Sequence, residues 1–326
     1  MQRISTLLPE GAPHAAGDRQ PRLLVVELWG VGDLALALPF LRAAAHHARV
    51  TLLAKPHAAP LLRRFCPEIE HVAFTAPWTA FTGKYRLLHW PWAELRAVLR
   101  GLRARRFDAA VSVRADPRDH ALMAFAGAKL RAGFPRAGSS LVLTDPLAVP
   151  ANPHRAAQWT AVAAHFGWSV AGQPPPIENR ASKIKNHVVI HTGAGHPVRE
   201  WPRDRFEEIA VRLRAAGWRA TLLDDSLRDL DTLLATLATA DRFIGNDSGP
   251  GHLAALLGVP TFTIFGPQLP EVFSPVHPQA AWIEGRPCVY KPCRDSCRFA
   301  SPHCIREITD DEVWSRLSTW LPARPA

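Results

Sequence analysis

The sequence predicts an α/β protein made of two doubly wound domains that face each other across a cleft. Its 326 residues, 47% of them apolar, can bury a large core and build two domains. From Arg22 onward, short apolar runs alternate with helical stretches, a pattern typical of βαβ units on a parallel sheet. Three consecutive prolines within residues 172–186 cannot continue a helix or a central strand, so this segment predicts the domain boundary.

The periodicity of apolar residues predicts strands and helices in both halves. The expected strands are residues 23–28, 50–54, 72–74 and 109–113, then 187–191, 219–223, 242–244 and 261–265. The expected helices are residues 34–47, 92–105 and 119–126, then 205–216, 230–240 and 252–257. The expected organisation is a disordered tail (1–21), a first domain (22–172), a linker (173–186), a second domain (187–308) and a final helix (309–326) that packs back on the first domain.

Positive charge exceeds negative charge by ten, because 39 Lys and Arg residues stand against 29 Asp and Glu residues. Only six of these cations are Lys. Such an excess of Arg suits anionic partners such as phosphates, acidic glycolipids or nucleic acid, although a bias in genome composition would explain it equally well. A nucleic-acid partner is not expected, because aromatic and basic residues are not interleaved as in RNA- or DNA-binding modules.

The sequence is expected to be cytoplasmic. The best candidate for a membrane span, residues 23–41, is interrupted by Glu27 and Asp33 and lacks the roughly 18 uninterrupted apolar residues that a span requires. The first twenty residues lack the cationic start and apolar segment of a secretory signal. The cysteine usage fits a reducing compartment better than a disulfide scaffold.

The first candidate for chemistry is the turn Gly30-Val31-Gly32-Asp33, between a predicted strand and a predicted helix. Its glycines permit a tight turn, and Asp33 would lie at the carboxyl end of the strand, where open α/β sheets bind ligands. Asp33 could equally be a simple N-cap of the helix. A dinucleotide fingerprint is not indicated, because its third glycine and later acidic residue are missing.

Two loops of the second half could bind an anion. In residues 191–202, Thr192 and Gly193 can present donors and Arg199 can bind a phosphate with two hydrogen bonds, although an ordinary loop with Arg199 in solvent is the alternative. Residues 245–252, Gly-Asn-Asp-Ser-Gly-Pro-Gly-His, join a strand to a helix whose free N–H groups would hold a diphosphate. Asp247 could also only cap this helix, and His252 could be a buried packing residue.

Four of the five cysteines are crowded near the C-terminus, with the spacing C-x4-C-x3-C-x6-C. Four thiols this close could form a structural site for zinc or iron, without a catalytic role. Free buried thiols or one redox-labile pair are the alternatives, because no pair has the C-x2-C spacing of common zinc modules. The four residues are Cys288, Cys293, Cys297 and Cys304.

Several blocks of the chain resemble the bacterial heptosyltransferase family. GNDSGPGHLAALLGVPTFTIFGP closely resembles the family's D-[ST]-G-P-x-H-L-A-A-x-x-G-V-P-x-x-x-x-F-G-P block, and HTGAGHPVREWPRDRFEEIA resembles its earlier Gly-rich, basic, Trp-Pro block. VGDLALALPFLRA is similar to the family's G-D-x-x-x-x-x-P helix start, FDAAVSVRADPRDHALMAFAGAKLRAGF to the end of its first half, and CVYKPCRDSCRFASPHCIREITDDEV to its cysteine-bearing end. The resemblance covers nearly everything after Arg22 and is specific between Asp247 and Pro267.

The resemblance implies the GT-B fold of glycosyltransferases, with two facing Rossmann-like domains, the first for the acceptor and the second for the donor. It implies inverting, metal-independent transfer of a heptose or related sugar from an ADP-heptose-like donor to a lipopolysaccharide core or other glycan. The acceptor would be an anionic glycan or glycolipid, which could bring the protein to the inner face of the inner membrane. Asp33 matches the proposed general base. The other expected site residues are Thr192, Gly193, Arg199, Asp247, Ser248, Gly249 and His252 for the donor, and Arg114, Asp116 and Arg118 for the acceptor.

Two departures from the family pattern concern the substrates. After the expected strand 219–223, the chain passes directly into the expected helix 230–240, so about one βα step of the donor domain is missing. That step helps the family to hold adenosine, which leaves the donor open. Near Asp33, Glu27 and Trp29 replace residues that are more often basic or small, which could indicate a different acceptor.

Two other functions remain open on the sequence. A catalytically degenerate family member could act as a carbohydrate-binding or assembly protein, because the shortened donor domain could have lost donor binding. A sugar-nucleotide epimerase could use the same architecture, but it would need further carboxylates in the cleft that the sequence does not identify. Hydrolysis or transfer of an ADP-sugar would exclude the first of these.

Overall fold

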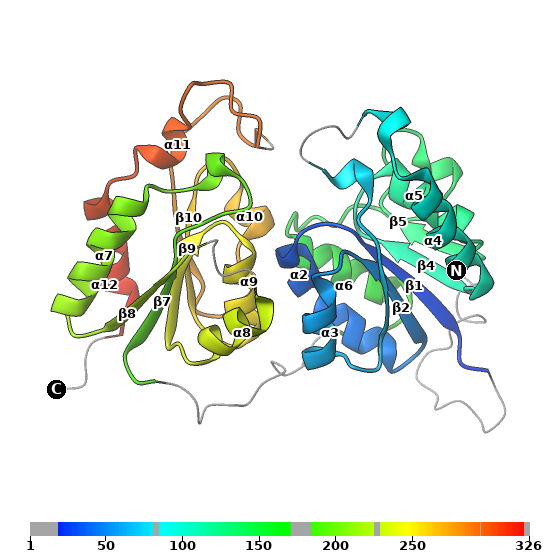
Figure 1. The fold of residues 1–326 in the computed structure, drawn as a ribbon, viewed down its shortest axis with the longest axis horizontal. Helices are drawn as coiled ribbons and strands as arrows, with labels where there is room; N and C mark the ends of the chain where they lie inside the picture. Colours follow the sequence, from blue (N-terminus) through cyan, green and yellow to red (C-terminus); the bar gives the residue numbers. More distant parts are fainter. Residues whose placement is uncertain (1–18, 81–84, 171–183, 225–228, 294, 323–326) are drawn as a thin grey trace. The chain divides into compact units, whose positions relative to one another are not determined.

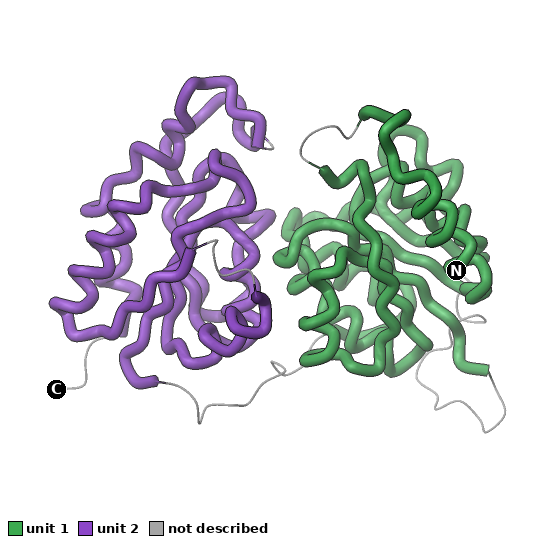
Figure 2. Tube along the Cα trace, in the orientation of Figure 1, with its two compact units in different colours: residues 1–173 green, residues 174–326 purple. Residues whose placement is uncertain are grey.

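We describe the protein from a computed structural model. It describes residues 19–80, 85–170, 184–224, 229–293 and 295–322. The chain divides into two compact units, residues 1–173 and 174–326, shown in Figure 2. The division falls inside the segment with three prolines. The expected disorder of the tail concerns residues that lie almost entirely outside the described part of the chain, as does most of the expected linker.

The described residues of the first unit alternate between strands and helices. Its elements are β1 (Arg22–Glu27), α2 (Val31–Ala45), β2 (Arg49–Ala54), α3 (Ala58–Phe65), β3 (Glu70–Ala73), α4 (Trp92–Ala104), β4 (Ala109–Ser112), α5 (Pro117–Phe125), β5 (Leu130–Gly133), β6 (Asp145–Pro146) and α6 (Arg155–His165). The strands form one parallel sheet in the order β3-β2-β1-β4-β5-β6. In Figure 1, α2, α3 and α6 cover one face and α4 and α5 the other, which explains why β1 is apolar along nearly its whole length.

The second unit repeats this winding with one strand fewer. Its elements are β7 (His187–His191), α7 (Arg203–Ala215), β8 (Arg219–Leu223), α8 (Leu230–Ala238), β9 (Arg242–Asn246), α9 (Gly249–Leu256), β10 (Thr261–Phe265), α10 (Pro270–Phe273), β11 (Ala281–Glu284), α11 (His303–Arg306) and α12 (Asp310–Trp320). The strands form a parallel sheet in the order β11-β10-β9-β7-β8. The predicted α/β class with doubly wound parallel sheets is therefore confirmed.

The predicted direct passage from the second strand of this unit to the next helix is confirmed. Within the described residues β8 pairs with β7 alone, whereas β2, at the same place in the first sheet, lies between β1 and β3. The side chains of β8 are half-buried or exposed, while five of the six in β2 are buried. Only six residues separate the end of β8 at Leu223 from the start of α8 at Leu230, which is too few for another strand and helix.

The C-terminal helix packs on the second unit, so the prediction that it returns to the first domain is wrong. Val313 and Leu317 of α12 are fully buried in the core that contains Ile190 of β7 and Phe206 of α7. A capping box at Thr309 starts the helix. The helix packs against α7 and against β11 at the edge of the sheet, so it completes the layer on one face of the second sheet (Figure 1).

Several short elements were not predicted from the sequence. These are the strands β5, β6 and β11 and the helices α3, α6, α10 and α11, which range from two residues in β6 to 11 residues in α6. Runs this short give little periodicity. In the part of the chain that the structure describes, no helix combines the length and the apolarity of a membrane span.

Candidate functional site

Asp33 lies in the first turn of α2, directly after β1. The helix starts after Gly30, whose conformation is extended, and no side chain caps this end. Asp33 is therefore not the N-cap, the alternative that its sequence position allowed. Its carboxylate is 3.7 Å from Nη1 of Arg114 and 3.9 Å from Nε of Arg155, and it keeps about a fifth of its surface exposed. Asp33 is thus a carboxylate held between two cations and open to a ligand.

Glu27, the last residue of β1, is a second carboxyl group beside Asp33. It is 2% exposed, and its Oε1 accepts a hydrogen bond from the backbone N–H of Trp29 at 3.1 Å. Its Oε2 is buried and has no hydrogen-bond partner among the described residues. Burial, reinforced by the negative charge of Asp33, raises the pKa of Glu27 to about 8. Glu27 therefore holds a proton at neutral pH.

The cations around this pair are themselves partly shielded from water. Burial lowers the pKa of Lys55, whose charge is favoured in turn by Asp33 and Glu27. Burial also lowers the pKa of Arg155, with the positive charge of Arg114 acting in the same direction. The guanidinium carbon of Arg114 lies 3.6 Å from the ring centre of Trp29, a cation–π contact that fixes its orientation. The group thus places three cationic side chains around the carboxylate of Asp33.

The three residues expected at the acceptor have different surroundings. Arg114 belongs to the Asp33 group described above. Asp116 instead caps α5 by accepting the backbone N–H of Arg118 at 3.0 Å, and the side chain of Arg118 returns to the same carboxylate at 2.9 and 2.7 Å. This pairing lowers the pKa of Asp116 against the opposing effect of burial. Asp116 and Arg118 therefore satisfy each other, and only Arg114 reaches the proposed base.

In the second unit, Asn246 joins the two predicted loops. This last residue of β9 is fully buried, and its side-chain amide donates to the backbone carbonyls of Thr192 and Gly193 at 2.8 and 3.3 Å. Its Oδ1 accepts the backbone N–H of Trp201 at 3.0 Å. Asn246 was not predicted as a site residue, although it stands beside Asp247 in the same motif. Thr192 and Gly193 thus serve the site through carbonyls that hold the loop in place.

The segment after Asn246 leads into α9. Ser248 occupies the N-cap position, but no side chain caps the helix, and its hydroxyl donates to the carbonyl of Asn246 at 3.3 Å. The helix starts at Gly249, three residues earlier than the sequence predicted, so that its first N–H groups lie next to Ser248. His252, the fourth residue of α9, is 8% exposed. An uncapped helix N-terminus attracts an anion through its N–H groups and dipole.

Arg199 is held by two carboxylates. Its Nη1 is 3.3 Å from Oδ2 of Asp247, which the sequence also predicts at the donor site. Its Nε and Nη2 donate to the two carboxylate oxygens of Asp295, each at 2.6 Å. Asp295 was missed, because nothing in its sequence surroundings distinguishes it from other acidic loop residues. The structure therefore brings Arg199, Asp247 and the start of α9 together, as predicted, and adds Asp295.

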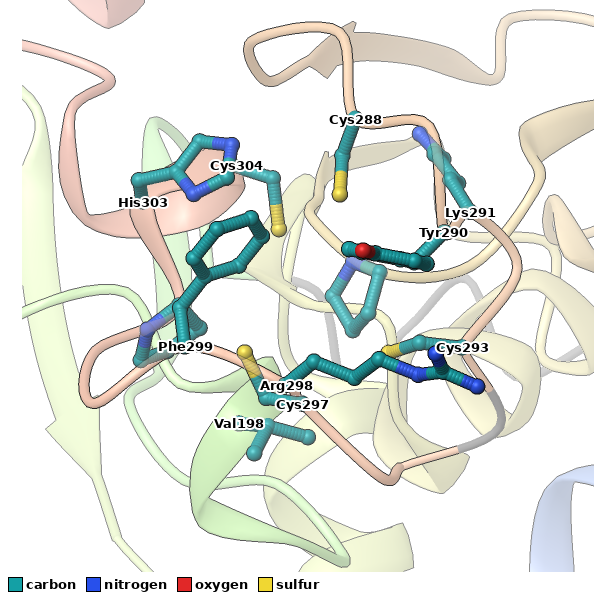
Figure 3. A pocket seen from close by; sticks show the side chains of 12 residues that line it. Val198, Cys288, Tyr290, Lys291, Cys293, Cys297, Arg298, Phe299, His303 and Cys304 are labelled. Carbon is teal, nitrogen blue, oxygen red and sulfur yellow. The ribbon is translucent and has the colours of Figure 1, made fainter.

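The four C-terminal cysteines line one pocket together with Val198, Tyr290 and Phe299 (Figure 3). All four are free thiols. Burial raises the pKa of Cys304 to about 11, and the other thiols reinforce this. Soft sulfur ligands suit zinc or iron. However, no three His, Cys, Asp or Glu side chains of the described residues are grouped so that they could hold a metal ion. The arrangement does not form the expected four-thiol site.

Comparisons with known proteins point to one family. The family model "Glycosyltransferase family 9 (heptosyltransferase)" matches residues 95–226 and 227–301. Lipooligosaccharide heptosyltransferase 2 of Campylobacter jejuni is 33% identical over 133 residues, which cover 40% of this chain and 39% of the relative. Lipopolysaccharide heptosyltransferase 1 of Pseudomonas aeruginosa is 27% identical over 173 residues, covering 42% and 48%. The chain thus spans less than half the length of these curated relatives.

Solved structures share the fold over nearly the whole length of both chains. A glycosyltransferase family 9 protein from Veillonella parvula gives a TM-score of 0.72 at 17% identity, covering 94% of this chain and 99% of the other. The Escherichia coli heptosyltransferase WaaC with ADP gives 0.70 at 15% identity, covering 92% and 100%. These likenesses confirm the predicted GT-B fold. Because the family model spans well over half of the sequence, the chain belongs to glycosyltransferase family 9, the heptosyltransferase family.

Proposed function

We propose that this protein is an inverting, metal-independent glycosyltransferase that moves a heptose or related sugar from an ADP-heptose-like donor to a lipopolysaccharide core or other glycan. The observation that carries the proposal is the anion site of the second unit, where Arg199 lies next to the uncapped start of α9. Family membership supports the same chemistry. Names of relatives support the substrates, since they describe heptosyltransferases of lipopolysaccharide and lipooligosaccharide and one solved with ADP.

The diphosphate of the donor would bind at the start of α9. The N–H of Gly249, the first residue of this helix, and the Arg199 guanidinium would offer donors, since Pro250 has no N–H and the N–H of Gly251 donates to the carbonyl of Ser248 at 3.2 Å. The positive end of the helix dipole would favour the negative charge that develops on the leaving group. Thr192, Gly193 and Ser248 border the same place through the contacts of Asn246. Arg199 would supply the charge that a metal ion supplies to the diphosphate in other enzymes.

Asp33 would act as the general base. Its carboxylate would take the proton of an acceptor hydroxyl while the hydroxyl oxygen forms a bond to the anomeric carbon of the donor. The bond between that carbon and the diphosphate oxygen breaks, and its electron pair leaves with the nucleotide diphosphate. Attack opposite to the leaving group inverts the anomeric centre. The displacement requires Asp33 and the diphosphate site to act on the same donor molecule.

The acceptor would be an anionic glycan or glycolipid. Arg114, Arg155 and Lys55 bring three positive charges to the two carboxyl groups of Asp33 and protonated Glu27, which leaves an excess of cation beside the base. A phosphate or carboxylate on the acceptor would balance that excess. A glycolipid acceptor would place the protein at the cytoplasmic face of the inner membrane, with no membrane span needed.

A catalytically degenerate carbohydrate-binding or assembly protein is the second candidate. The observation that favours it is the exposed strand β8, because the family's additional step at this edge helps to hold adenosine. We propose the enzyme first, since Arg199, Asp247 and the start of α9 are all in place without that step.

The deciding experiment is calorimetric titration of the full chain with ADP, UDP and GDP, followed by incubation with ADP-heptose. We expect ADP to bind and ADP-heptose to be consumed, by hydrolysis or by transfer to a lipopolysaccharide core. Nucleotide binding without any turnover would favour the degenerate family member. Failure of all three nucleotides to bind would refute the donor site.

A further inference from the structure

The phosphate-binding edge of Arg199 is occupied by a carboxylate from the same chain. Asp295 accepts hydrogen bonds from Nε and Nη2 of Arg199, both at 2.6 Å, in the planar two-point geometry that a phosphate would also use. The two residues are 96 positions apart in the sequence. Asp247 takes the remaining terminal nitrogen at 3.3 Å. All three guanidinium nitrogens therefore already face carboxylates.

Asp295 is held in this position by more than Arg199. Nε2 of Gln268, which is 5% exposed, lies 3.3 Å from Oδ1 of Asp295. The Asp295 side chain is 12% exposed, so water offers it little competition. Its backbone has a φ of +67°, in the left-handed region that residues other than glycine seldom adopt and that Asp tolerates better than most. The loop is thus built so that this carboxylate reaches Arg199.

The loop that carries Asp295 is the one that carries the cysteines. Cys293 and Cys297 flank Asp295 at two residues on either side, and both line the pocket of Figure 3. Val198, directly before Arg199, lines the same pocket. The cysteine-bearing loop and the Arg199 loop therefore pack against each other, and a movement of one changes the distance between Asp295 and Arg199.

We propose that Asp295 is an internal competitor of the donor diphosphate, a gate that occupies Arg199 until the diphosphate displaces it. The inference rests on the proposed function, because it takes Arg199 to be a diphosphate ligand. When only a fraction of the protein is in the binding-competent state, the apparent affinity for the ligand falls in proportion to that fraction. The gate therefore lowers affinity for the nucleotide, because the diphosphate must displace the Asp295 carboxylate from Arg199.

The test is calorimetric binding of ADP to the full chain and to Asp295→Asn, which removes the charge and keeps the size. We expect about tenfold tighter binding or more, the factor for losing a competing charge-assisted contact. Asp311→Asn is the matched control. It removes the same charge from the same unit, at an exposed carboxylate that pairs with Arg212, and its affinity should stay at the wild-type value within about twofold.

Two further variants keep the test decisive. Asp295→Gly removes the carboxylate and suits the positive φ, so it replaces Asp295→Asn if that variant does not fold. In the Arg199→Ala background, the gain from Asp295→Asn should shrink, because no guanidinium is left for Asp295 to occupy. An equal gain in both backgrounds would mean that the contact is irrelevant.

The outcomes separate the gate from the proposed function. Equal or weaker ADP binding by Asp295→Asn and Asp295→Gly, with clear binding by the wild type, overturns the gate and makes Asp295 a residue that positions Arg199. If ADP, UDP and GDP bind neither to the wild type nor to the Asp295 variants, the donor site itself is refuted, and the gate is refuted with it.

Discussion

The two units place opposite charge arrangements after the first strand of the same winding. In the first unit the carboxylate of Asp33 lies between the cations Arg114 and Arg155. In the second unit the cation Arg199 lies between the carboxylates Asp247 and Asp295. In the proposed mechanism, the first group would place an anionic acceptor beside the base, and the second would offer a cation to the diphosphate. Two similar frameworks therefore carry complementary chemistry through a few loop residues.

The sheets of the two units also differ in their number of strands. The first has six strands in the order β3-β2-β1-β4-β5-β6, and the second ends at β8 with no further strand in the described residues. The shorter second sheet still contains β7 and β9, and α9 follows β9. These elements position Arg199, Asp247 and Ser248. If the proposed donor binds here, the shortened sheet edge would alter the surroundings of its nucleoside and leave the proposed diphosphate site intact.

The largest effect is expected at Asp33. Asp33→Asn keeps the shape of the side chain but cannot take a proton, so sugar transfer should fall by about a hundredfold to ten-thousandfold. ADP affinity, measured by calorimetry, should stay unchanged, because the diphosphate site lies in the second unit. Glu94→Gln, a change of the same kind at an exposed position of α4, should retain transfer. Near-wild-type turnover by Asp33→Asn would remove Asp33 from the role of base.

The next effect concerns Glu27, the carboxyl group beside that base. Its pKa is about 8 in the folded protein, against the ordinary glutamate value of 4.5 that the unfolded chain would have. Between these values the folded state holds a proton that the unfolded state has lost, so stability falls as the pH rises from about 4.5 to about 8. Glutamine does not titrate, so the stability of Glu27→Gln does not decrease with pH in this way. Its stability should therefore improve relative to the wild type across that range by about 4 kcal/mol.

Denaturant unfolding at pH 5 and pH 8.5 measures this difference. Glu68→Gln, at an exposed position of the same unit, serves as the control and should follow the wild-type dependence on pH. Parallel curves for the wild type and Glu27→Gln would show that Glu27 is ionised in the folded protein at neutral pH. The carboxyl pair of the first unit would then carry two negative charges.

The sequence could predict the framework and the motif residues but not the partners that come from distant loops. The sequence predicts residues 187–191 as a strand with the observed bounds, because β7 has three adjacent β-branched residues at its centre and is buried along its whole length. Arg199 and Asp247 were found from loop motifs after strands. Asp295 was not, because 96 positions separate it from Arg199 and only the folded loop brings them together. The prediction that the final helix packs on the first domain was wrong for the same reason, because the sequence of an apolar helix face does not show which domain it contacts.

Substitution of Arg199 is expected to have a smaller effect, measured here as a loss of ADP affinity. Arg199→Ala should weaken ADP binding by about tenfold to a hundredfold, because it removes a two-point phosphate contact. Arg199→Lys should lie between this variant and the wild type, since it keeps the charge without the planar geometry. Arg203→Ala, exposed at the start of α7, is the control. Unchanged calorimetric affinity of Arg199→Ala would exclude Arg199 from the donor site.

The smallest effect is expected from removal of metal. The proposed mechanism requires no ion at the Asp33 group or the Arg199 group, where fixed cations lie within 4 Å of the carboxylates. Transfer measured with and without EDTA should therefore be equal. Elemental analysis of the purified chain tests the cysteine pocket separately: zinc or iron near one equivalent would mean that the thiols close around an ion, and substoichiometric metal would mean free thiols. Loss of transfer in EDTA, restored by a divalent cation, would contradict the role given to Arg199 in the second unit. The fixed cation at Arg199 would then be insufficient for the leaving group.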